Sequence, residues 1–591
     1  MAGRLLSKHV RLRLAPSAPV CLAMHSSRTL CVQVRADTTA TRNAVAETAA
    51  ADLAEEELRG GNILRLRTRR RIERENADAL LGGGAQRLEK HHASGRLSAR
   101  ERLLLLLDQD TFHEMDRLKE SRNNNGHSRS AAKQKKNGMG DGVVTGRGLI
   151  DGRTVFVYSQ DFTVQGGSLG EAHAEKICKV MDLAAHAKAP VIGISDSGGA
   201  RISESVAALS AYSSIFKRIV KMSGYVPQIS VVMGPAAGGA VYAPALTDFV
   251  FMVRETSHMF LTGPDVVEQV TREKVSFESL GGADVHASKS GVAHYVGTDD
   301  IDVLRRVREL CSFLPSHAFD VSPPTTDHIT CEDDIARRDE SLDWVVPDDS
   351  KEPYDMRYII ERVVDGGHFF EIHRSHAQNL LVGFARLGGR SVGIVANQPT
   401  HMAGVLDINA SMKGARFVRF CDAFNVPLVT FVDVPGFLPG TGQEHNGIIR
   451  HGAKLLFAFA DATVPKINVI TRKAFGGAYC VLASKEFFDY NYAWPTAEIA
   501  VMGAAGAVRI LNHKEISAAA SPEDAKALLQ RLENEYAEEF VNPLIAAHRG
   551  YVDAIIQPAD TRRLIIHDLE CAGDASTRES VWPRKHDNLP I

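Results

Sequence analysis

Residues 191–201 read VIGISDSGGAR, an apolar run followed by an aspartate and a glycine-rich loop. Residues 428–437 read LVTFVDVPGF and repeat this design. A short, continuously apolar run bounded by turn residues is typical of a strand that is buried on both faces. Glycine at its end permits positive φ and lets a ligand approach the main chain. Both stretches therefore predict a central strand of a parallel sheet that ends in an open backbone loop.

The similarity of these two stretches is part of an internal repeat. An offset of 237 maps Gly152 onto Gly389, Pro190 onto Pro427 and Asp196 onto Asp433. An offset of 238 maps Pro227 onto Pro465 and Gly238-Gly239-Ala240 onto Gly476-Gly477-Ala478. Matched landmarks in one order, with one residue of drift, indicate two copies of one fold.

Each copy contains the same predicted elements. Expected strands cover 155–159, 191–195 and 229–233 in the first copy and 392–396, 428–432 and 467–471 in the second, and expected helices cover 170–187 and 412–425. Buried strands that alternate with helices predict an α/β fold with largely parallel sheets.

The predicted domains follow from the repeat and from changes in composition. An N-domain is expected over residues 88–320 and a C-domain over 340–591. A Pro- and acid-rich linker over 321–339 joins them, and a helical lead over 37–87 precedes them. Residues 117–140 form a polar, basic loop, and the Arg65–Arg74 run is expected on a solvated helix face.

Composition excludes several classes of protein. The chain of 591 residues is 44% hydrophobic and 24% charged, as expected for a globular protein of several domains. Its net charge of −3 does not indicate the excess of positive charge that is typical of proteins that bind nucleic acid. The eight cysteines form no CxxC pair, which argues against a zinc module and favours a reducing compartment. The uncharged stretch 222–247 is interrupted by prolines and glycines, so a buried strand and turn are expected there instead of a membrane span.

The first 36 residues contain no acidic residue but six Arg and Lys residues among apolar ones. This composition predicts a mitochondrial transit peptide over 1–36, and hence a location in the mitochondrial matrix. A disordered basic tail is the alternative.

Candidate chemistry lies in the loops that follow the buried strands. Their main-chain N–H groups, where a helix begins, favour a developing anion and could form an oxyanion hole. The alternative is that the glycines only permit close helix–strand packing. Duplication of both loops at matched positions favours a functional role, since ligands gather at the carboxyl ends of strands in α/β folds.

Side chains offer no competing chemistry. Ser197 does not lie in a G-x-S-x-G motif, and neither an H-E-x-x-H motif nor a Walker A motif is present. No metal or ATP site is therefore expected in this chain. Lys413 is expected to be a solvated helix residue.

Five motifs carry a resemblance to a known family. They are GRLSARER (95–102) before five leucines, SGGARI (197–202), TGPDV (262–266), KGARFV (413–418) and AWPTAE (493–498). From about residue 88 to 591 the chain resembles the carboxyltransferase subunits of biotin-dependent acyl-CoA carboxylases, most closely those that act on propionyl-CoA. The resemblance implies two tandem crotonase-like (ClpP/crotonase) domains and a homo-hexameric core, with active sites between the N-domain of one subunit and the C-domain of another.

The resemblance also implies partners and a reaction. Biotin is carried on a separate alpha chain with the biotin carboxylase, likewise in six copies, which agrees with the absence of an Ala-Met-Lys-Met motif here. CO2 passes from carboxybiotin to the α-carbon of a short-chain acyl-CoA, converting propionyl-CoA to methylmalonyl-CoA, and the freed biotin nitrogen takes the α-proton.

By the resemblance, backbone N–H groups of Gly198 and Gly199 stabilise the thioester enolate, and those of Gly477 and Ala478 stabilise the biotin enolate. Further contacts are implied on both sides. On the acyl-CoA side they are Ala200, Arg201, Gly238, Gly239, Ala240 and Cys480, and on the biotin side Pro435, Gly436, Phe437 and Gly476.

Cys480 is a departure from the family, because propionyl-type chains usually carry Asp at this position, which shapes the acyl pocket. Cysteine is neutral and more apolar, so acetyl-CoA and butyryl-CoA remain alternatives to propionyl-CoA. Gln165, where similar chains often have an apolar residue, is a second difference.

Three other functions compete with this one. An enoyl-CoA hydratase or isomerase needs positioned carboxylates, for which Glu204 is the candidate, but it needs one such domain and not two. A carboxybiotin-driven decarboxylase subunit needs a membrane partner, which the transit-like N-terminus disfavours. A non-catalytic scaffold subunit would tolerate bulky residues at Gly198 or Gly477.

Overall fold

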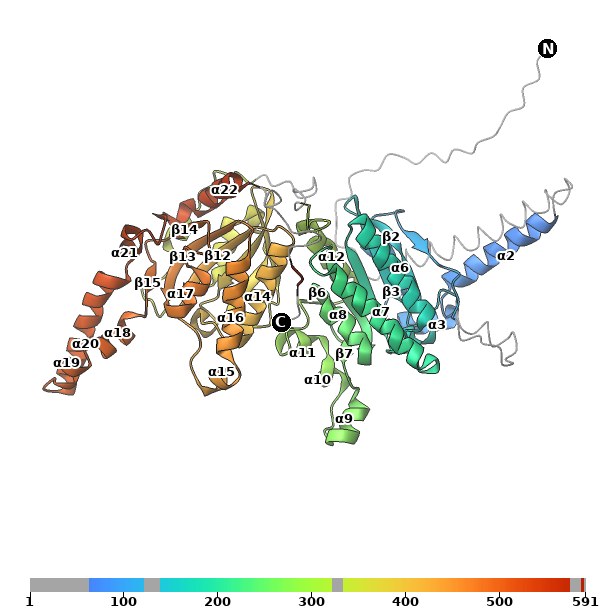
Figure 1. The fold of residues 1–591 in the computed structure, drawn as a ribbon, viewed down its shortest axis with the longest axis horizontal. Helices are drawn as coiled ribbons and strands as arrows, with labels where there is room; N and C mark the ends of the chain where they lie inside the picture. Colours follow the sequence, from blue (N-terminus) through green and yellow to red (C-terminus); the bar gives the residue numbers. More distant parts are fainter. Residues whose placement is uncertain (1–62, 122–138, 321–332, 574–585, 589–591) are drawn as a thin grey trace, which may run out of the picture. The chain divides into compact units, whose positions relative to one another are not determined.

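The computed structural model describes residues 63–121, 139–320, 333–573 and 586–588 (Figure 1). The chain divides into a unit of residues 1–77 and a unit of residues 78–591. The predicted transit peptide lies outside the described residues, as do most of the predicted 117–140 loop and residues 321–332 of the predicted linker.

Most of helix α2 (Ile63–Leu80) belongs to the first unit. Its arginines face solvent and pair along the helix, as Arg69 does with Glu73 (2.9 Å) and Arg71 with Glu75 (2.7 Å). Such exposed pairs contribute only a few tenths of a kcal/mol each. The basic run is therefore a solvated helix face, as predicted.

The second unit holds two eight-stranded sheets with the same topology. The first sheet has the order β1-β2-β3-β4-β5-β6-β8, with β7 paired to β5, and the second has the order β9-β10-β11-β12-β13-β14-β16, with β15 paired to β13. The first sheet contains β1 His113–Met115, β2 Val143–Ile150, β3 Arg153–Gln160, β4 Val191–Ser197, β5 Gln228–Ala237, β6 Phe249–Val253, β7 His258–Phe260 and β8 Tyr295–Gly297. The second contains β9 Phe370–Ile372, β10 Leu380–Leu387, β11 Arg390–Asn397, β12 Leu428–Val434, β13 Lys466–Phe475, β14 Tyr490–Ala493, β15 Glu498–Ala500 and β16 Ala554–Ile555.

The repeat extends to strand register. In each sheet the first three strands are antiparallel and the others pair in parallel. The β4–β5 register shifts between Ser195 and Ser197, and the β12–β13 register shifts between Val432 and Val434. The aspartate of each copy lies at this irregularity. These features confirm the predicted α/β fold with largely parallel sheets.

Helices cover both faces of each sheet (Figure 1). Apart from the helices over 264–271 and 513–536, which project away from the sheets, their positions follow from apolar faces that pack on the strands. In the N-domain they are α3 Ala85–Ala93, α4 Ala99–Leu106, α6 Glu171–Ala187, α7 Val206–Met222, α8 Tyr242–Leu246, α9 Pro264–Thr271, α10 Phe277–Gly281, α11 Ala283–Ser288 and α12 Asp300–Phe313. In the C-domain they are α13 Met356–Val363, α14 Ile408–Ala423, α15 Thr441–His445, α16 Ile448–Asp461, α17 Gly476–Leu482, α18 Ala504–Leu511, α19 His513–Ser517, α20 Pro522–Tyr536, α21 Pro543–His548 and α22 Thr561–Ala572.

One apolar core runs from the first repeat into the second. Phe249 on β6 contacts Phe420 on α14, with ring centroids 4.6 Å apart, and Phe384 on β10, at 6.0 Å. All three rings are buried. The two repeats therefore share a core as well as a fold.

Lys413 is buried, with 4% of its surface exposed, so the expectation of a solvated residue is wrong. Its ammonium group donates to three backbone carbonyls of the segment 373–377. Lys176, at the equivalent position of the first repeat, donates in the same way to the carbonyls of Gly140 and Val143. Each lysine thus fastens the segment before the second strand of its sheet to the following helix, and the acceptors compensate its burial.

A C-terminal segment from His586 to Asn588 links the two domains. The Asn588 carbonyl accepts a hydrogen bond from the Ser223 hydroxyl (3.4 Å), and its side-chain amide donates to Asp248 (3.1 Å). Ser223 and Asp248 both belong to the N-domain. His586 contacts Asp422 of the C-domain through its Nε2 atom (3.0 Å). The segment therefore bonds to both repeats, although it lies far from its N-domain partners in the sequence.

Replacing Asn588 with alanine is expected to lower the free energy of unfolding by about 1–3 kcal/mol, because Asp248 then lacks one donor in a buried position. Burial already raises the pKa of Asp248 to about 6. Urea denaturation followed by circular dichroism measures the loss. The control Asn534→Ala, on the exposed side of α20, should change stability little. Equal stability of the two variants would contradict the linking role.

Candidate functional site

The candidate site consists of two backbone loops in each domain, at the carboxyl ends of adjacent parallel strands. In the N-domain, an Ala200 loop (198–201) follows β4, and a Gly239 turn (238–240) follows β5. The two are adjacent, because a Cβ atom on Gly199 would lie 2.9 Å from the carbonyl oxygen of Ala237. In the C-domain, a Phe437 loop (435–437) follows β12, and a Gly477 turn (476–478) follows β13.

The amides of Gly198 and Gly199, predicted as oxyanion donors, already have acceptors. Gly198 N–H donates to the carbonyl of Gly166 (2.9 Å), and Gly199 N–H donates to the hydroxyl of Ser197 (3.2 Å). A donor that is satisfied within the chain is not open to a ligand without breaking that bond. An open amide in this loop must therefore come from a neighbouring residue.

Ala200 presents the open amide of this loop. Its neighbours form a parallel bridge with Leu169, in which Arg201 N–H donates to Leu169 O (2.9 Å) and Leu169 N–H donates to Gly199 O (2.9 Å). The Gly199 carbonyl, which accepts from Leu169, and the Ala200 N–H belong to one trans peptide group and point in opposite directions, so Ala200 N–H points away from Leu169. In the described part of the chain this N–H has no acceptor.

The C-domain repeats this bridge at an offset of 237. Leu406 N–H donates to Gly436 O (3.0 Å), and Leu438 N–H donates to Leu406 O (2.8 Å). By the same geometry, Phe437 N–H points away from Leu406, and it has no acceptor among the described residues. The open amides are thus Ala200 and Phe437, one in each repeat.

Each turn begins a helical segment without a side-chain cap. Gly238 and Gly476 adopt positive φ (64° and 59°), a conformation that favours glycine. The first amides of such a segment lack intrahelical acceptors. Gly477 is exposed, whereas Ala478 is fully buried, so the Gly477 amide lies nearer to solvent.

Arg201, which the resemblance implies as a substrate contact, is engaged within the chain. Its side chain is 3% exposed, and its guanidinium contacts Asp141 (2.6 Å), Glu204 (2.8 Å) and the carbonyl of Ser168 (2.8 Å). These contacts hold the guanidinium beneath the Ala200 loop. These contacts are all internal to the chain, and the expected substrate contact stays a prediction.

Glu204, the candidate carboxylate of a hydratase, is also occupied. Burial favours its neutral form, but hydrogen bonds from Glu171 N–H (2.6 Å) and from Arg201 outweigh this effect and lower the pKa of Glu204. A carboxylate held ionised by internal donors is a poor general acid near neutral pH. This geometry disfavours the hydratase alternative.

The remaining predicted residues lie around the two loops. Cys480 is exposed on α17. Phe437 is half-buried, and its ring lies 3.0 Å from the Cβ position of Gly452 on α16 and 3.9 Å from that of Gly477. Pro435, Gly436 and Ala240 belong to the same loops and turns. Gln165 adopts positive φ (52°) in the turn before Gly166, and nothing in the structure explains its choice.

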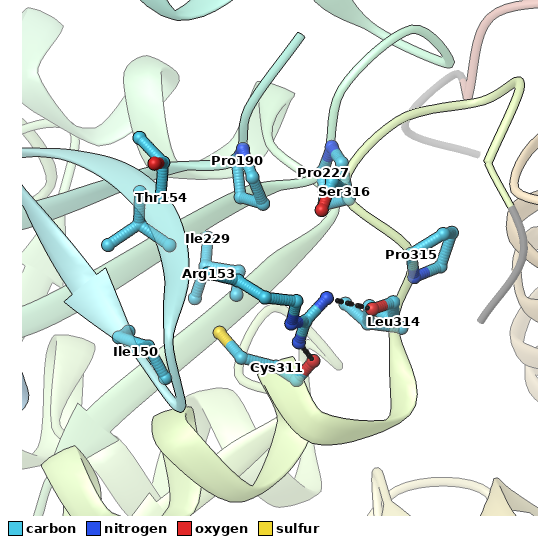
Figure 2. A pocket seen from close by; sticks show the side chains of 11 residues that line it. Ile150, Arg153, Thr154, Pro190, Pro227, Ile229, Cys311, Leu314, Pro315 and Ser316 are labelled. Carbon is cyan, nitrogen blue, oxygen red and sulfur yellow. Dashed lines mark hydrogen bonds between the residues drawn. The ribbon is translucent and has the colours of Figure 1, made fainter. Parts of the chain in front are cut away.

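A cavity of about 10 Å³ lies at the opposite edge of the first sheet (Figure 2). Pro190 and Pro227 line it at the amino ends of β4 and β5. Arg153 reaches across it and donates to the carbonyls of Leu314 (2.7 Å) and Cys311. Its size and these bonds make it a packing feature of the strand beginnings and not a ligand site.

The part of the chain that the structure describes contains no cluster of metal-ligating side chains. Within the same residues, no helix has both the length and the apolar character needed to cross a membrane.

The fold and the paired backbone loops define the class of crotonase-like carboxyltransferases. The carboxyl transferase domain family matches residues 90–589, and the chain belongs to this family.

Curated relatives align with this chain over nearly their whole length. The chain is 55% identical over 515 residues to a propionyl-CoA carboxylase carboxyltransferase subunit of Haloferax mediterranei, covering 87% of this chain and 97% of the relative. It is 55% identical over 524 residues to the mitochondrial propionyl-CoA carboxylase beta chain of Mus musculus, covering 88% and 93%.

Solved structures are also similar. A transcarboxylase 12S hexamer structure with methylmalonyl-coenzyme A and methylmalonic acid bound matches with a TM-score of 0.82 and 46% identity, covering 90% of this chain and 99% of that one. A single-chain, multi-domain long-chain acyl-CoA carboxylase matches with a TM-score of 0.73 and 26% identity, covering 84% and 48%.

Proposed function

We propose that this chain is the carboxyltransferase subunit of a biotin-dependent carboxylase that converts propionyl-CoA to methylmalonyl-CoA. The observation that carries the proposal is a duplicated pair of open backbone amides. Ala200 and Gly239 form one pair in the N-domain, and Phe437 and Gly477 form the other in the C-domain. Each pair sits at the carboxyl ends of neighbouring parallel strands.

The N-domain pair suits the thioester of propionyl-CoA. Removal of the α-proton places negative charge on the thioester oxygen, and two converging N–H donors stabilise that oxygen most when it is charged. The α-carbon then forms the new bond to the carboxyl carbon. Glu204 is already bonded within the chain, so no carboxylate of this loop is needed as the base.

The C-domain pair suits a ureido oxygen. The Cβ position of Gly436 meets no atom within 4 Å and that of Gly477 meets only the edge of the Phe437 ring at 3.9 Å, so the backbone is open for a planar group. Biotin, bound here from a partner chain, supplies the carboxyl group and a basic nitrogen. Phe437 and Gly477 hold and orient its oxygen through their N–H groups.

Exposed apolar side chains beside both loops support assembly into a hexamer. Next to the Ala200 loop, Ile202 is 95% and Val206 73% exposed, and next to the Gly477 turn, Val501 is 82% exposed. Apolar surface of this kind marks protein–protein contacts. In the proposed hexamer, the N-domain of one subunit faces the C-domain of another, and an alpha chain that carries biotin completes the enzyme.

The composition of residues 1–36 supports import into the mitochondrial matrix. Relatives occur both in mitochondria and in an archaeon, so location is tested directly. A fluorescent protein fused after residue 40 should reach mitochondria, and cytosolic fluorescence would contradict the proposal.

The test of the function is transfer of the carboxyl group from methylmalonyl-CoA to free biotin by the purified oligomer. Acetyl-, propionyl- and butyryl-CoA are compared in the forward direction with the biotin-bearing partner. Clear preference for propionyl-CoA supports the proposal. An oligomer that is folded yet inactive with every substrate would leave the scaffold alternative.

Cys480→Asp is expected to sharpen the preference for propionyl-CoA over butyryl-CoA by about tenfold, because a charged wall disfavours an added methylene, a group worth about 1–3 kcal/mol. The ratio of the two kcat/KM values measures the effect. Cys571→Asp, at an exposed cysteine of α22, is the control. An unchanged ratio would exclude Cys480 from the acyl pocket.

A further inference from the structure

Three ionic side chains meet beneath the Ala200 loop and are here called the N-domain clamp: Arg201, Asp141 and Glu204. All three are shielded, with side-chain exposures of 3%, 0% and 5%. Burial raises the pKa of Asp141, against the opposing effect of Arg201. A buried ion group of this kind costs desolvation and is weak evidence for a stabilising role.

The clamp is attached to the peptide groups that orient the Ala200 amide. Arg201 donates from its backbone to Leu169 O (2.9 Å) and from its guanidinium to Ser168 O (2.8 Å). One residue thus holds two successive carbonyls on the far side of the bridge. The bridge fixes the direction of Ala200 N–H. Because the clamp holds the peptide groups of the bridge, the clamp helps to fix this direction as well.

The other end of the clamp fixes the start of α6. Glu204 accepts from Glu171 N–H (2.6 Å), the first residue of that helix. Gly170 precedes it, and a Cβ atom there would lie 2.5 Å from both Arg201 and Glu204. The clamp therefore fills the space between the Ala200 loop and α6.

The second repeat holds the same carbonyl with a different side chain. At an offset of 237 the clamp positions are occupied by Leu438, Gln378 and Thr441, which carry no charge. Val405, the equivalent of Ser168, nevertheless accepts from the side-chain amide of Asn379 (2.7 Å). Two unrelated side chains thus restrain the peptide before the bridge in both repeats.

We infer that Arg201, held by Asp141 and Glu204, is a positioning residue for the acyl-CoA half of the reaction, fixing Ala200 N–H where the thioester oxygen becomes charged. Asn379 has the matching role on the biotin side. The inference rests on the proposed function. Arg201 itself does not touch the substrate.

The test measures affinity for an enolate mimic, a CoA derivative with a nitronate in place of the thioester enolate, beside affinity for propionyl-CoA. In Asp141→Asn, Glu204→Gln and Arg201→Lys, we expect the nitronate to bind about 10- to 100-fold more weakly, since small misplacements of a donor cost about 10²-fold. Affinity for propionyl-CoA, which lacks the charge, should change little. The matched control Arg218→Lys, at an exposed Arg–Asp pair with Asp182 away from the loops, should bind the nitronate as the wild type does.

The outcomes separate the inference from the proposed function. Clamp variants that are folded and bind the nitronate as tightly as the wild type would overturn the inference and leave the function standing. Equal loss of both affinities would also overturn it, by showing that the clamp only maintains the pocket. A wild-type oligomer that binds neither CoA compound would instead remove the proposed function. If Arg201→Lys does not fold, the two carboxylate variants still decide.

Discussion

Gly477→Pro is expected to lower the rate of carboxyl transfer by about 10²–10³-fold, the usual cost of one oxyanion donor. Proline removes the N–H group, yet its fixed φ is compatible with the first turn of a helix, where the amide has no intrahelical acceptor. Gly477 lies in that turn of α17, and a Cβ atom there meets no atom closer than 3.9 Å. Space is therefore available for the Cβ atom of the ring.

Gly477→Ala is the matched control, because it adds a carbon at the same place and keeps the N–H group. It should retain activity within a few-fold of the wild type. Steady-state kinetics with propionyl-CoA and the biotin-bearing partner separate the two variants. Equal activity of the proline and alanine variants would exclude Gly477 N–H as a donor and favour the amide of Ala478.

Arg102→Met is expected to lower the free energy of unfolding by about 3–5 kcal/mol, the cost of breaking a buried ion pair from one side. Arg102 is fully buried and contacts Asp300 (2.9 Å), Asp196 (2.9 Å) and the carbonyl of Met233 (2.8 Å). Its removal leaves two carboxylates and one carbonyl short of a donor. Chemical denaturation measures the loss.

The loss should depend on pH with a definite sign. Burial raises the pKa of Asp196 from 3.8 to about 6, against the opposing effects of Arg102 and Arg96. Without Arg102 this pKa rises further, so the ionised carboxylate destabilises the variant most above pH 6, and acidification relieves part of the cost. Arg218→Met, which breaks an exposed pair with Asp182, should cost less than about 1 kcal/mol. Similar losses in both variants would contradict this account.

The repeat and its central strands could be predicted from the sequence, because apolar runs, glycines and prolines recur at a nearly constant offset. The identity of the open amides could not. Gly198 and Gly199 look free in the sequence, and only the folded chain brings Gly166 O and Ser197 Oγ to them. The offset itself contained a usable signal, since Ala200 and Phe437 occupy equivalent positions, as do Gly239 and Gly477.

Burial of charged residues was the other feature that the sequence concealed. Lys413 and Arg201 are of residue types that usually lie on the surface. Both are buried here, because backbone carbonyls and a carboxylate from distant segments accept their hydrogen bonds. Such acceptors leave no local pattern, because they depend on where strands end after folding. The sequence shows that the repeat pairs Arg201 with the uncharged Leu438. The reason for this difference becomes clear only from the structure, where Arg201 donates to the carbonyl of Ser168.

The aromatic contacts of Phe249 with Phe384 and Phe420 have a consequence for the independence of the two halves. A fragment cut between the repeats would expose this cluster to water, so neither half is expected to fold or refold as a separate module. Melting of the intact chain should then follow a single cooperative transition for residues 78–591. A single transition means that the duplicated halves unfold as one thermodynamic unit, so that substitutions in one half are constrained by the other.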